Sequence, residues 1–279
     1  MNLIDLEKKD SMITKNYIVG LPESGKTTFL GALAYTILNS MPGESLFTLD
    51  IIEEIEYLNG LADTWSKCEK MGRTNVGQYE SCTLFLKDSV GNKIEIKLPD
   101  QSGEAFKHVI ENRTMSEMMY NNILECDNVF LFINPSVISK DVMITDIDVQ
   151  FRGNDEEDTR FEGRNIHEQA QYVMLLQDIK AVRKKMTNLK VVISAWDDYK
   201  DITSPKELLK ERLPLVWQYL FSNYEYFRCE YWGISAQGGD VTKPEEKERL
   251  LDYENAIDRI IVVDERNEDI SHDLTVLLK

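Results

Sequence analysis

Residues 20–27 carry the clearest chemical signal in this sequence of 279 residues, because they fit the phosphate-binding pattern G-x-x-x-x-G-K-[ST] in full. The two glycines let the backbone curl so that its N–H groups face a phosphate, and the start of the following helix favours the same anion. The Lys26 ammonium is placed to reach the β- and γ-phosphates of a nucleotide, and the Thr27 hydroxyl to coordinate Mg²⁺. We therefore predict a nucleotide-binding loop formed by Gly20, Glu23, Ser24, Gly25, Lys26, Thr27 and Thr28.

A second polar group, Asp-Gln-Ser-Gly at residues 100–103, follows alternating apolar residues at 94–98 that predict a strand. Asp100, at the carboxyl end of that strand, would hold Mg²⁺ through water, and the Gly103 backbone N–H would meet a γ-phosphate. An aspartate shortly before a glycine is more often a plain turn. The preceding strand and the position after the phosphate loop nevertheless favour the metal site.

Residues 194–197, Ser-Ala-Trp-Asp, follow a later apolar strand and suggest how a base would be recognised. A carboxylate there accepts hydrogen bonds from N1–H and the exocyclic amine of guanine, a donor pair that adenine lacks. We assign this role to Asp197, with Asp198 as a competitor and a helix-capping turn as the alternative. Ser235 and Ala236 end the next strand, where a backbone N–H would contact the base carbonyl.

These residues must be positioned by strands that alternate with helices, and the hydrophobic pattern of the sequence predicts such elements. Strands are predicted at 17–19, 81–87, 93–98, 129–134, 189–194 and 227–234, and helices at 30–38, 51–65, 104–124, 165–185, from Pro205 with a break at Pro214, and from Pro244. Residues 259–264 suit either element, and the polar break at 88–92 predicts an antiparallel hairpin. The expected fold is a three-layer α/β P-loop NTPase fold: a mostly parallel sheet with one antiparallel strand, helices on both faces, and insertions.

The domain organisation follows from the same pattern. We predict a single domain over 1–279 with a core at about 17–237. A minimal core of this type needs about 170 residues. The surplus lies in residues 44–73, in an acidic insertion at about 135–164, and in a C-terminal extension at 238–279.

Taken together, these four segments resemble the motifs of the translation-factor-related (TRAFAC) class of P-loop GTPases. The longer string I-V-G-L-P-E-S-G-K-T-T-F-L-G-A-L is similar to a bacterial branch, the double-GTPase family of predicted conflict (defence) systems. The resemblance covers roughly Tyr17–Gln237. It implies GTP/GDP and Mg²⁺ as cofactors and an effector or GTPase-associated protein as partner.

This sequence departs from the class at two places. The third motif is usually Asn/Thr-Lys-x-Asp, whereas Ser194 and Ala195 occupy its first two positions, so Trp196 would stack on the base in place of the lysine stem. The glutamine that orients water in Ras-like proteins is replaced by Glu104. A carboxylate is unfavourable beside a γ-phosphate, so we expect slow hydrolysis, in a class whose intrinsic rates are already about 10⁻⁴–10⁻² s⁻¹.

A switch threonine that closes on Mg²⁺ and the γ-phosphate should lie before the strand at 81–87. Thr74 fits best, and the neighbouring Arg73 would act as an arginine finger supplied in cis. The alternatives for these two roles are Thr48, Thr64 and Thr83 for the threonine, and Arg113, Arg152 and Arg160 for the arginine.

Composition excludes several classes of function. There are 32 Lys+Arg against 49 Asp+Glu, a net charge of −17, which argues against a nucleic-acid binder. No apolar run approaches the roughly 20 residues that span a bilayer, so no membrane role is expected. Four scattered cysteines without a C-x-x-C pair indicate reduced thiols in a cytoplasmic protein.

The sequence thus favours a guanine-nucleotide-binding molecular switch with slow Mg²⁺-dependent GTP hydrolysis, signalling to a partner protein. One alternative is a P-loop ATPase or kinase, whose lid arginines would be Arg152, Arg160 and Arg164 in the acidic insertion. The other is a nucleotide-binding scaffold without hydrolase activity, suggested by Glu104 and the altered third motif.

Overall fold

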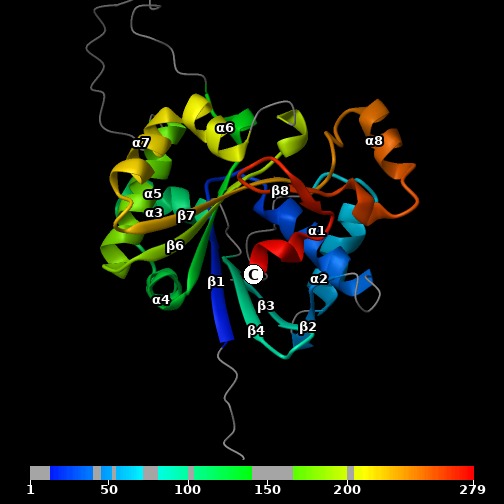
Figure 1. Ribbon diagram of the computed structural model, residues 1–279, viewed down its shortest axis with the longest axis horizontal. Coiled ribbons are helices and arrows are strands. Elements are labelled where there is room, and N and C mark those ends of the chain that lie inside the picture. The colour runs from blue at the N-terminus through cyan, green and yellow to red at the C-terminus, as the bar shows by residue number, and fades with distance from the viewer. Residues whose placement is uncertain are drawn as a thin grey trace, which may run out of the picture.

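One mixed sheet organises the molecule, and its strands in the described residues number nine (Figure 1). The computed structural model describes residues 13–39, 45–51, 55–71, 81–99, 104–139, 166–199 and 204–279. In spatial order the strands are β2 (Phe47–Ile51), β3 (Ser81–Asp88), β4 (Lys93–Pro99), β1 (Ile13–Val19), β5 (Asn128–Ile133), β6 (Thr187–Ile193), β7 (Phe227–Ser235), β8 (Ile261–Val263) and β9 (Asp269–Ser271).

The five central strands, from β4 to β7, are parallel to one another. Strand β3 is antiparallel to both of its neighbours, as the hairpin at 88–92 predicts. Strand β8 is a second antiparallel strand, because it pairs with β7 and β9 in that sense. The predicted mostly parallel α/β sheet is confirmed, and β8 resolves the ambiguity at 259–264.

The central strands are apolar throughout because both of their faces are covered. In β5, Val129, Leu131 and Ile133 belong to one buried cluster, and Phe130 and Phe132 belong to the other. Side chains alternate between the faces of a strand, so an unbroken apolar run requires helices on both sides.

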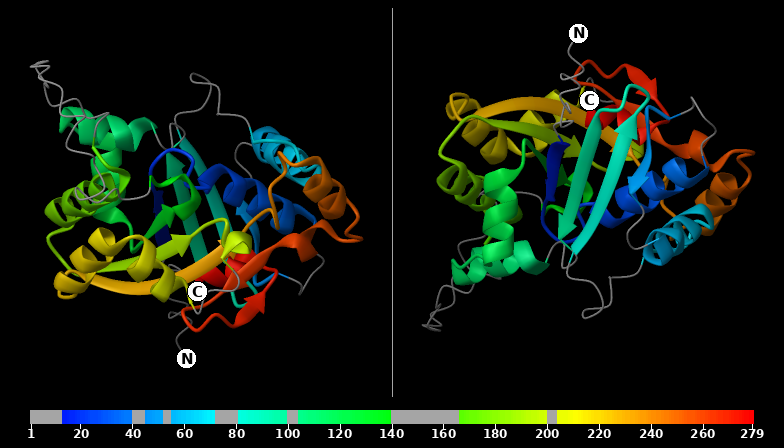
Figure 2. Two further views of the ribbon diagram at one scale, coloured as in Figure 1. Left: turned by 90° about the horizontal axis from the view of Figure 1, so that it is seen from above. Right: turned by 90° about the horizontal axis from the view of Figure 1, so that it is seen from below.

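Helices form the two outer layers (Figures 1 and 2). On one face lie α1 (Lys26–Asn39), α2 (Ile55–Ser66) and the 3₁₀ segment η7 (Leu274–Leu278), with α8 (Pro244–Leu251) on the same side of the molecule. On the other face lie α3 (Glu104–Asn112), α4 (Glu117–Glu125), α5 (Glu168–Arg183), α6 (Pro205–Arg212) and α7 (Pro214–Ser222). The three-layer arrangement and the division at Pro214 are as predicted.

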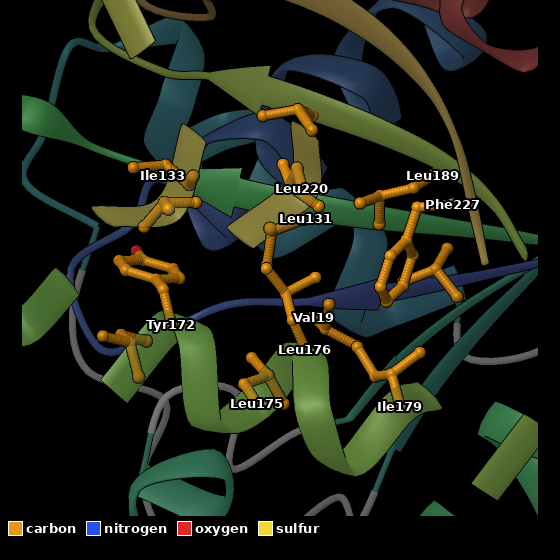
Figure 3. Close-up of a cluster of buried hydrophobic side chains, with 14 of the residues drawn as sticks. Val19, Leu131, Ile133, Tyr172, Leu175, Leu176, Ile179, Leu189, Leu220 and Phe227 are labelled. Atoms are coloured by element: carbon orange, nitrogen blue, oxygen red, sulfur yellow. The ribbon is translucent and has the colours of Figure 1, made fainter. Parts of the chain in front are cut away.

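Helix α5 shows how the sequence builds one of these interfaces (Figure 3). Tyr172, Leu175, Leu176 and Ile179 recur at the helical spacing i, i+3, i+4, i+7, and none is more than 1% exposed. They pack on the β1, β5 and β6 side chains of the same cluster. Truncating one of these leucines to alanine typically costs about 2–5 kcal/mol of folding free energy.

Two of the predicted helices were wrong in extent. The helix predicted at 104–124 is broken, because Arg113 adopts a left-handed φ of 54° and Ser116 caps α4 by accepting the Met119 N–H at 3.2 Å. Both pieces pack on one cluster, so hydrophobic periodicity continues through the break. Residue Ile51, expected to begin the second helix, instead ends β2, and the helix starts at Ile55.

The surplus segments are tied to the core at identifiable points. At the start of the acidic insertion, the Ser139 N–H and hydroxyl both donate to the Glu168 carboxylate, each at 3.3 Å, which holds residue 139 against the first turn of α5. Residues 140–165 lie outside the described residues. In the C-terminal extension, the carbonyls of Leu277 and Lys279 accept from the buried Lys190 ammonium, both at 2.7 Å. Within the described ranges, no helix has both the length and the apolar composition needed to cross a membrane.

Candidate nucleotide site

The predicted phosphate loop connects β1 to α1, as its chemistry requires. Gly20 and Gly25 adopt φ values of 155° and 90°, which side chains rarely allow. A Cβ on Gly20 would lie 2.6 Å from the Phe132 carbonyl oxygen, and one on Gly25 would lie 2.8 Å from the Ser194 side chain. The loop therefore rests directly on the carboxyl ends of β5 and β6.

The Lys26 side chain folds back over this loop. Its ammonium donates to the carbonyls of Gly20 at 3.0 Å and Leu21 at 2.7 Å, and to the Ser24 hydroxyl at 2.7 Å. Lys26 is only 3% exposed, and this burial lowers the pKa of its ammonium to about 7. The first turn of α1 thus presents a desolvated cation at the place where the β- and γ-phosphates are expected.

Three side chains from neighbouring elements support the phosphate loop on the side that faces the sheet. The Ser194 hydroxyl donates to the Ser24 carbonyl at 2.9 Å, and the Asn134 amide donates to the Glu23 carbonyl at 3.3 Å. The Tyr172 hydroxyl donates at 3.2 Å to the Phe132 carbonyl that underlies Gly20. Ser194 begins the segment that was predicted to contact the nucleotide, and in the structure its hydroxyl supports the phosphate loop. Asn134 and Tyr172 were not predicted, although a polar residue directly after a buried strand is a signal that would have singled out Asn134.

Replacing Ser194 with alanine tests this support. The Ser24 carbonyl loses its buried donor, which costs about 1–3 kcal/mol when no other partner replaces it. We expect a lower melting temperature and a several-fold weaker nucleotide affinity, measured by thermal unfolding and calorimetry. Ser222→Ala, at an exposed position at the end of α7, is the matched control. Wild-type nucleotide affinity in Ser194→Ala would show that the bond does not shape the loop.

The third and fourth predicted motifs meet at the ends of β6 and β7. Asp197 lies in the 3₁₀ turn η5 (Trp196–Asp198), and its carboxylate accepts a hydrogen bond from the Ser235 hydroxyl. The same hydroxyl accepts the Gly238 N–H at 2.9 Å. Burial raises the pKa of the Asp197 carboxyl, an effect that the Ser235 hydrogen bond partly offsets. Asp197 lies inside η5, and the helix that follows, α6, is capped instead by Ser204, whose hydroxyl accepts the Glu207 N–H at 3.2 Å, so the helix-capping alternative does not describe Asp197.

Trp196 does not fit its predicted role. It is 1% exposed and lies against β7, where a Cβ on Gly233 would come within 2.5 Å of its ring. A ring this deeply buried has no free face on which a base could stack, so the stacking prediction is corrected. The competitor Asp198 is engaged elsewhere, because its carboxylate accepts from the exposed Ser136 hydroxyl at 3.2 Å.

Comparison with known protein families shows which family this chain belongs to. The Double-GTPase 1 family matches residues 17–279. The chain belongs to the Double-GTPase 1 family. This confirms the resemblance seen in the motifs and extends it through the C-terminal segment. GTP binding by this member follows from the family assignment, whereas the details of its switch cycle do not.

Solved structures with a similar arrangement have low sequence identity to this Double-GTPase 1 member. The signal recognition particle receptor SRb-GTP/SRX complex of Chaetomium thermophilum is 12% identical, with 85% of this chain and 96% of that chain covered and a TM-score of 0.41. The Arl6 BBS3 small GTPase of Trypanosoma brucei, with a bound nucleotide analogue GppNp, is 11% identical, with 86% of this chain and 95% of that chain covered and a TM-score of 0.40. The G domain of the T. maritima FeoB iron transporter is 14% identical, with 88% of this chain and 100% of that chain covered and a TM-score of 0.35. A search of curated proteins found no match.

Several predicted site residues of this Double-GTPase 1 member lie outside the described residues: Arg73, Thr74, Asp100 and Gly103. Glu104 begins α3, but its side chain is likewise not described. Of the competing threonines, Thr48 and Thr83 lie within strands and Thr64 within α2, where its hydroxyl donates to the Gly60 carbonyl. Over the described part of the chain, no group of three His, Cys, Asp or Glu residues is gathered as a metal site.

Proposed function

We propose that the protein is a guanine-nucleotide-dependent molecular switch that hydrolyses GTP slowly and signals its nucleotide state to a partner protein. The Lys26 ammonium is the observation that supports this most strongly. It is buried among acceptors of its own loop, and no carboxylate of the described residues pairs with it. A buried cation without a counter-ion is unfavourable. The β- and γ-phosphates of a nucleotide would supply that missing charge.

Guanine is the base that the proposal assigns to this site. Asp197 and Ser235 lie at the ends of adjacent strands and are joined by a hydrogen bond, so the carboxylate is held beside the loop that follows β7. A buried carboxylate accepts two N–H groups of guanine, and adenine would leave it unpaired.

Mg²⁺ fits the donor types that the sequence provides. Thr27 is half-buried beside Lys26 in the first turn of α1, and hydroxyl and carboxylate oxygens are the ligands that this cation prefers. Thr27 and Asp100 would hold the ion, with Thr74 joining them when GTP is bound. The ion would neutralise charge on the β- and γ-phosphate oxygens.

Slow hydrolysis and partner signalling are the finer parts of the proposal. Glu104 stands where a water-orienting glutamine is expected, which supports a low intrinsic rate. A switch with a low intrinsic rate remains in the GTP-bound state long enough for a partner to recognise it.

A calorimetric titration with GTP, GDP, ATP and ADP in the presence of Mg²⁺ tests nucleotide choice. The proposal expects both guanine nucleotides to bind far more tightly than the adenine nucleotides. Equal affinity for ATP would favour the kinase or ATPase alternative. Single-turnover hydrolysis of GTP then separates a slow hydrolase from a scaffold, with Lys26→Ala as the blank. A rate no greater than the blank would contradict the hydrolase part.

Nucleotide binding should also take up a proton. The pKa of Lys26 is about 7 in the free protein, and a bound phosphate raises it, because opposite charge favours the ammonium. The protonated form therefore dominates in the complex, and affinity should fall as pH rises above 7, by up to about tenfold per pH unit. Calorimetry at pH 8 in HEPES and in Tris, two buffers with different ionisation enthalpies, measures this uptake as a buffer-dependent heat. Identical heats in the two buffers would show that Lys26 is already fully charged.

A further inference from the structure

The loop that follows β7 is held by two segments far away in the sequence. We call residues 235–238 the base loop. At the end of α2, the Trp65 indole N–H donates to the Ala236 carbonyl at 2.8 Å, and the Trp65 carbonyl accepts the Gln237 amide at 3.3 Å. On the other segment, η6 (Ala256–Arg259), the backbone of Arg259 packs on Gly238 so closely that a Cβ there would lie 2.6 Å from the Arg259 carbonyl.

Arg259 joins these two segments. Its side chain is buried, and the guanidinium carbon lies 4.5 Å from the centroid of a Trp65 ring. The guanidinium N–H groups donate at 3.4 Å to the carbonyls of Trp65, Ser66 and Leu250, and its Nε donates at 3.0 Å to the Ala256 carbonyl. One planar cation therefore fixes the last turn of α2, the end of α8 and η6 relative to one another.

The charge of Arg259 is balanced in an unusual way. Within the ranges that the structure describes, no carboxylate lies at salt-bridge distance from it. Instead it faces the last carbonyls of α2, where the helix dipole is negative, the Cys68 sulfur, to which it donates a hydrogen bond, and the π face of Trp65. A buried arginine held by carbonyls in a fork geometry fixes position as well as charge.

We infer that Trp65 and Arg259 are positioning residues for guanine recognition. The inference rests on the proposed function of the site. A continuous set of contacts connects them to the base-reading carboxylate: Asp197 is bonded to Ser235, the Ser235 hydroxyl to the Gly238 N–H, and Gly238 packs on Arg259. Between Ser235 and Gly238 in the base loop, the Ala236 carbonyl is held by the Trp65 indole N–H.

The two segments involved are those that exceed a minimal nucleotide-binding core. Trp65 belongs to the surplus at 44–73, and Arg259 to the extension at 238–279. Trp65 bonds the base loop and Arg259 packs on it, and within the described residues neither side chain hydrogen-bonds residues 20–28; the Trp65 ring packs on α1 only further along, at Tyr35. This predicts an effect that depends on the base of the ligand.

Trp65→Phe is the sharpest test, because it removes the indole N–H and keeps an aromatic ring beneath Arg259. Calorimetry should compare GTP, ATP and inorganic triphosphate, the last of which contacts only the phosphate loop. We expect GTP affinity to fall about two- to tenfold, the effect of losing one hydrogen bond that shapes the site. Affinity for inorganic triphosphate should not change, so the preference for GTP over ATP should shrink.

Two further variants separate a positioning role from a general loss of stability. Trp217→Phe, in α7 on the opposite face of the sheet, should leave all three affinities unchanged. Arg259→Lys keeps the charge without the fork and should change affinities in the same pattern as Trp65→Phe, and thermal unfolding checks that it is folded. Equal losses for GTP and inorganic triphosphate, or no loss for either, would overturn the positioning role. A wild-type protein without a preference for guanine would instead overturn the proposed function.

Discussion

Lys26→Met should abolish binding of GTP and GDP while leaving the ligand-free protein folded. Hydrogen bonds to charged groups contribute about 1.5–3 kcal/mol each, and this ammonium is expected to make several of them to the phosphates. An affinity loss of at least about 100-fold is therefore expected. Calorimetry in Mg²⁺ measures it, and Lys180→Met serves as control at a lysine of α5 that bonds Asn223 instead.

The same variant has a second, pH-dependent signature. The pKa of Lys26 is about 7 in the folded protein and higher in the unfolded chain. The unfolded state therefore binds more protons between these values, and wild-type stability gains from rising pH across that window. Any stability advantage of the methionine variant should be largest near pH 7 and should shrink towards pH 10. A stability difference that is constant with pH would mean that Lys26 titrates normally.

Asp197→Asn should change the base that the site prefers. The amide replaces one carboxylate acceptor with a donor, so it faces the N–H groups of guanine unfavourably and suits the carbonyl of xanthine. We expect GTP affinity to fall by about 100-fold and xanthosine triphosphate to bind better than GTP. Competition of the two triphosphates against a fluorescent nucleotide measures the exchange.

Asp198→Asn is the natural control for this change, because the neighbouring carboxylate bonds Ser136 rather than Ser235. Unchanged GTP affinity in Asp197→Asn, together with a loss in Asp198→Asn, would transfer the base-reading role to Asp198. In wild type, GTP affinity should also weaken on acidification. Because burial raises the pKa of Asp197, this weakening should begin at higher pH than for an exposed aspartate.

The sequence predicted the parts of this molecule that depend on local pattern. The phosphate loop follows from the residue types at 20–27, and the buried strands follow from apolar runs such as 129–134. The break between α3 and α4 could not be predicted in this way, because it lies between two pieces that pack on the same cluster. Strand β2 was also missed, since an edge strand of five residues has too short a pattern to distinguish from a helix start.

Among the predicted site residues that the structure describes, position in the fold was predictable and the role of the side chain less so. Ser194 and Trp196 were identified from their position after a strand, yet one supports the phosphate loop and the other lies in the core. Position along a strand predicts which end of the sheet a residue reaches, whereas side-chain direction depends on neighbours such as Gly233. The contacts of Trp65 and Arg259 span more than 190 residues of sequence, and no local pattern could predict them.

The contact between Trp196 and Gly233 has a consequence for how nucleotide preference can change. The Trp196 indole packs against Gly233 of β7, and Trp196 and Asp197 belong to the same turn. The packing of the core therefore determines how far the Asp197 turn lies from the sheet. A substitution that never approaches the ligand, such as a larger residue at 233, would tilt that turn and shift the carboxylate. With Asp197 in its proposed role, nucleotide preference is therefore coupled to the packing of the core, and substitution at buried positions is a route by which related chains change the base that they prefer.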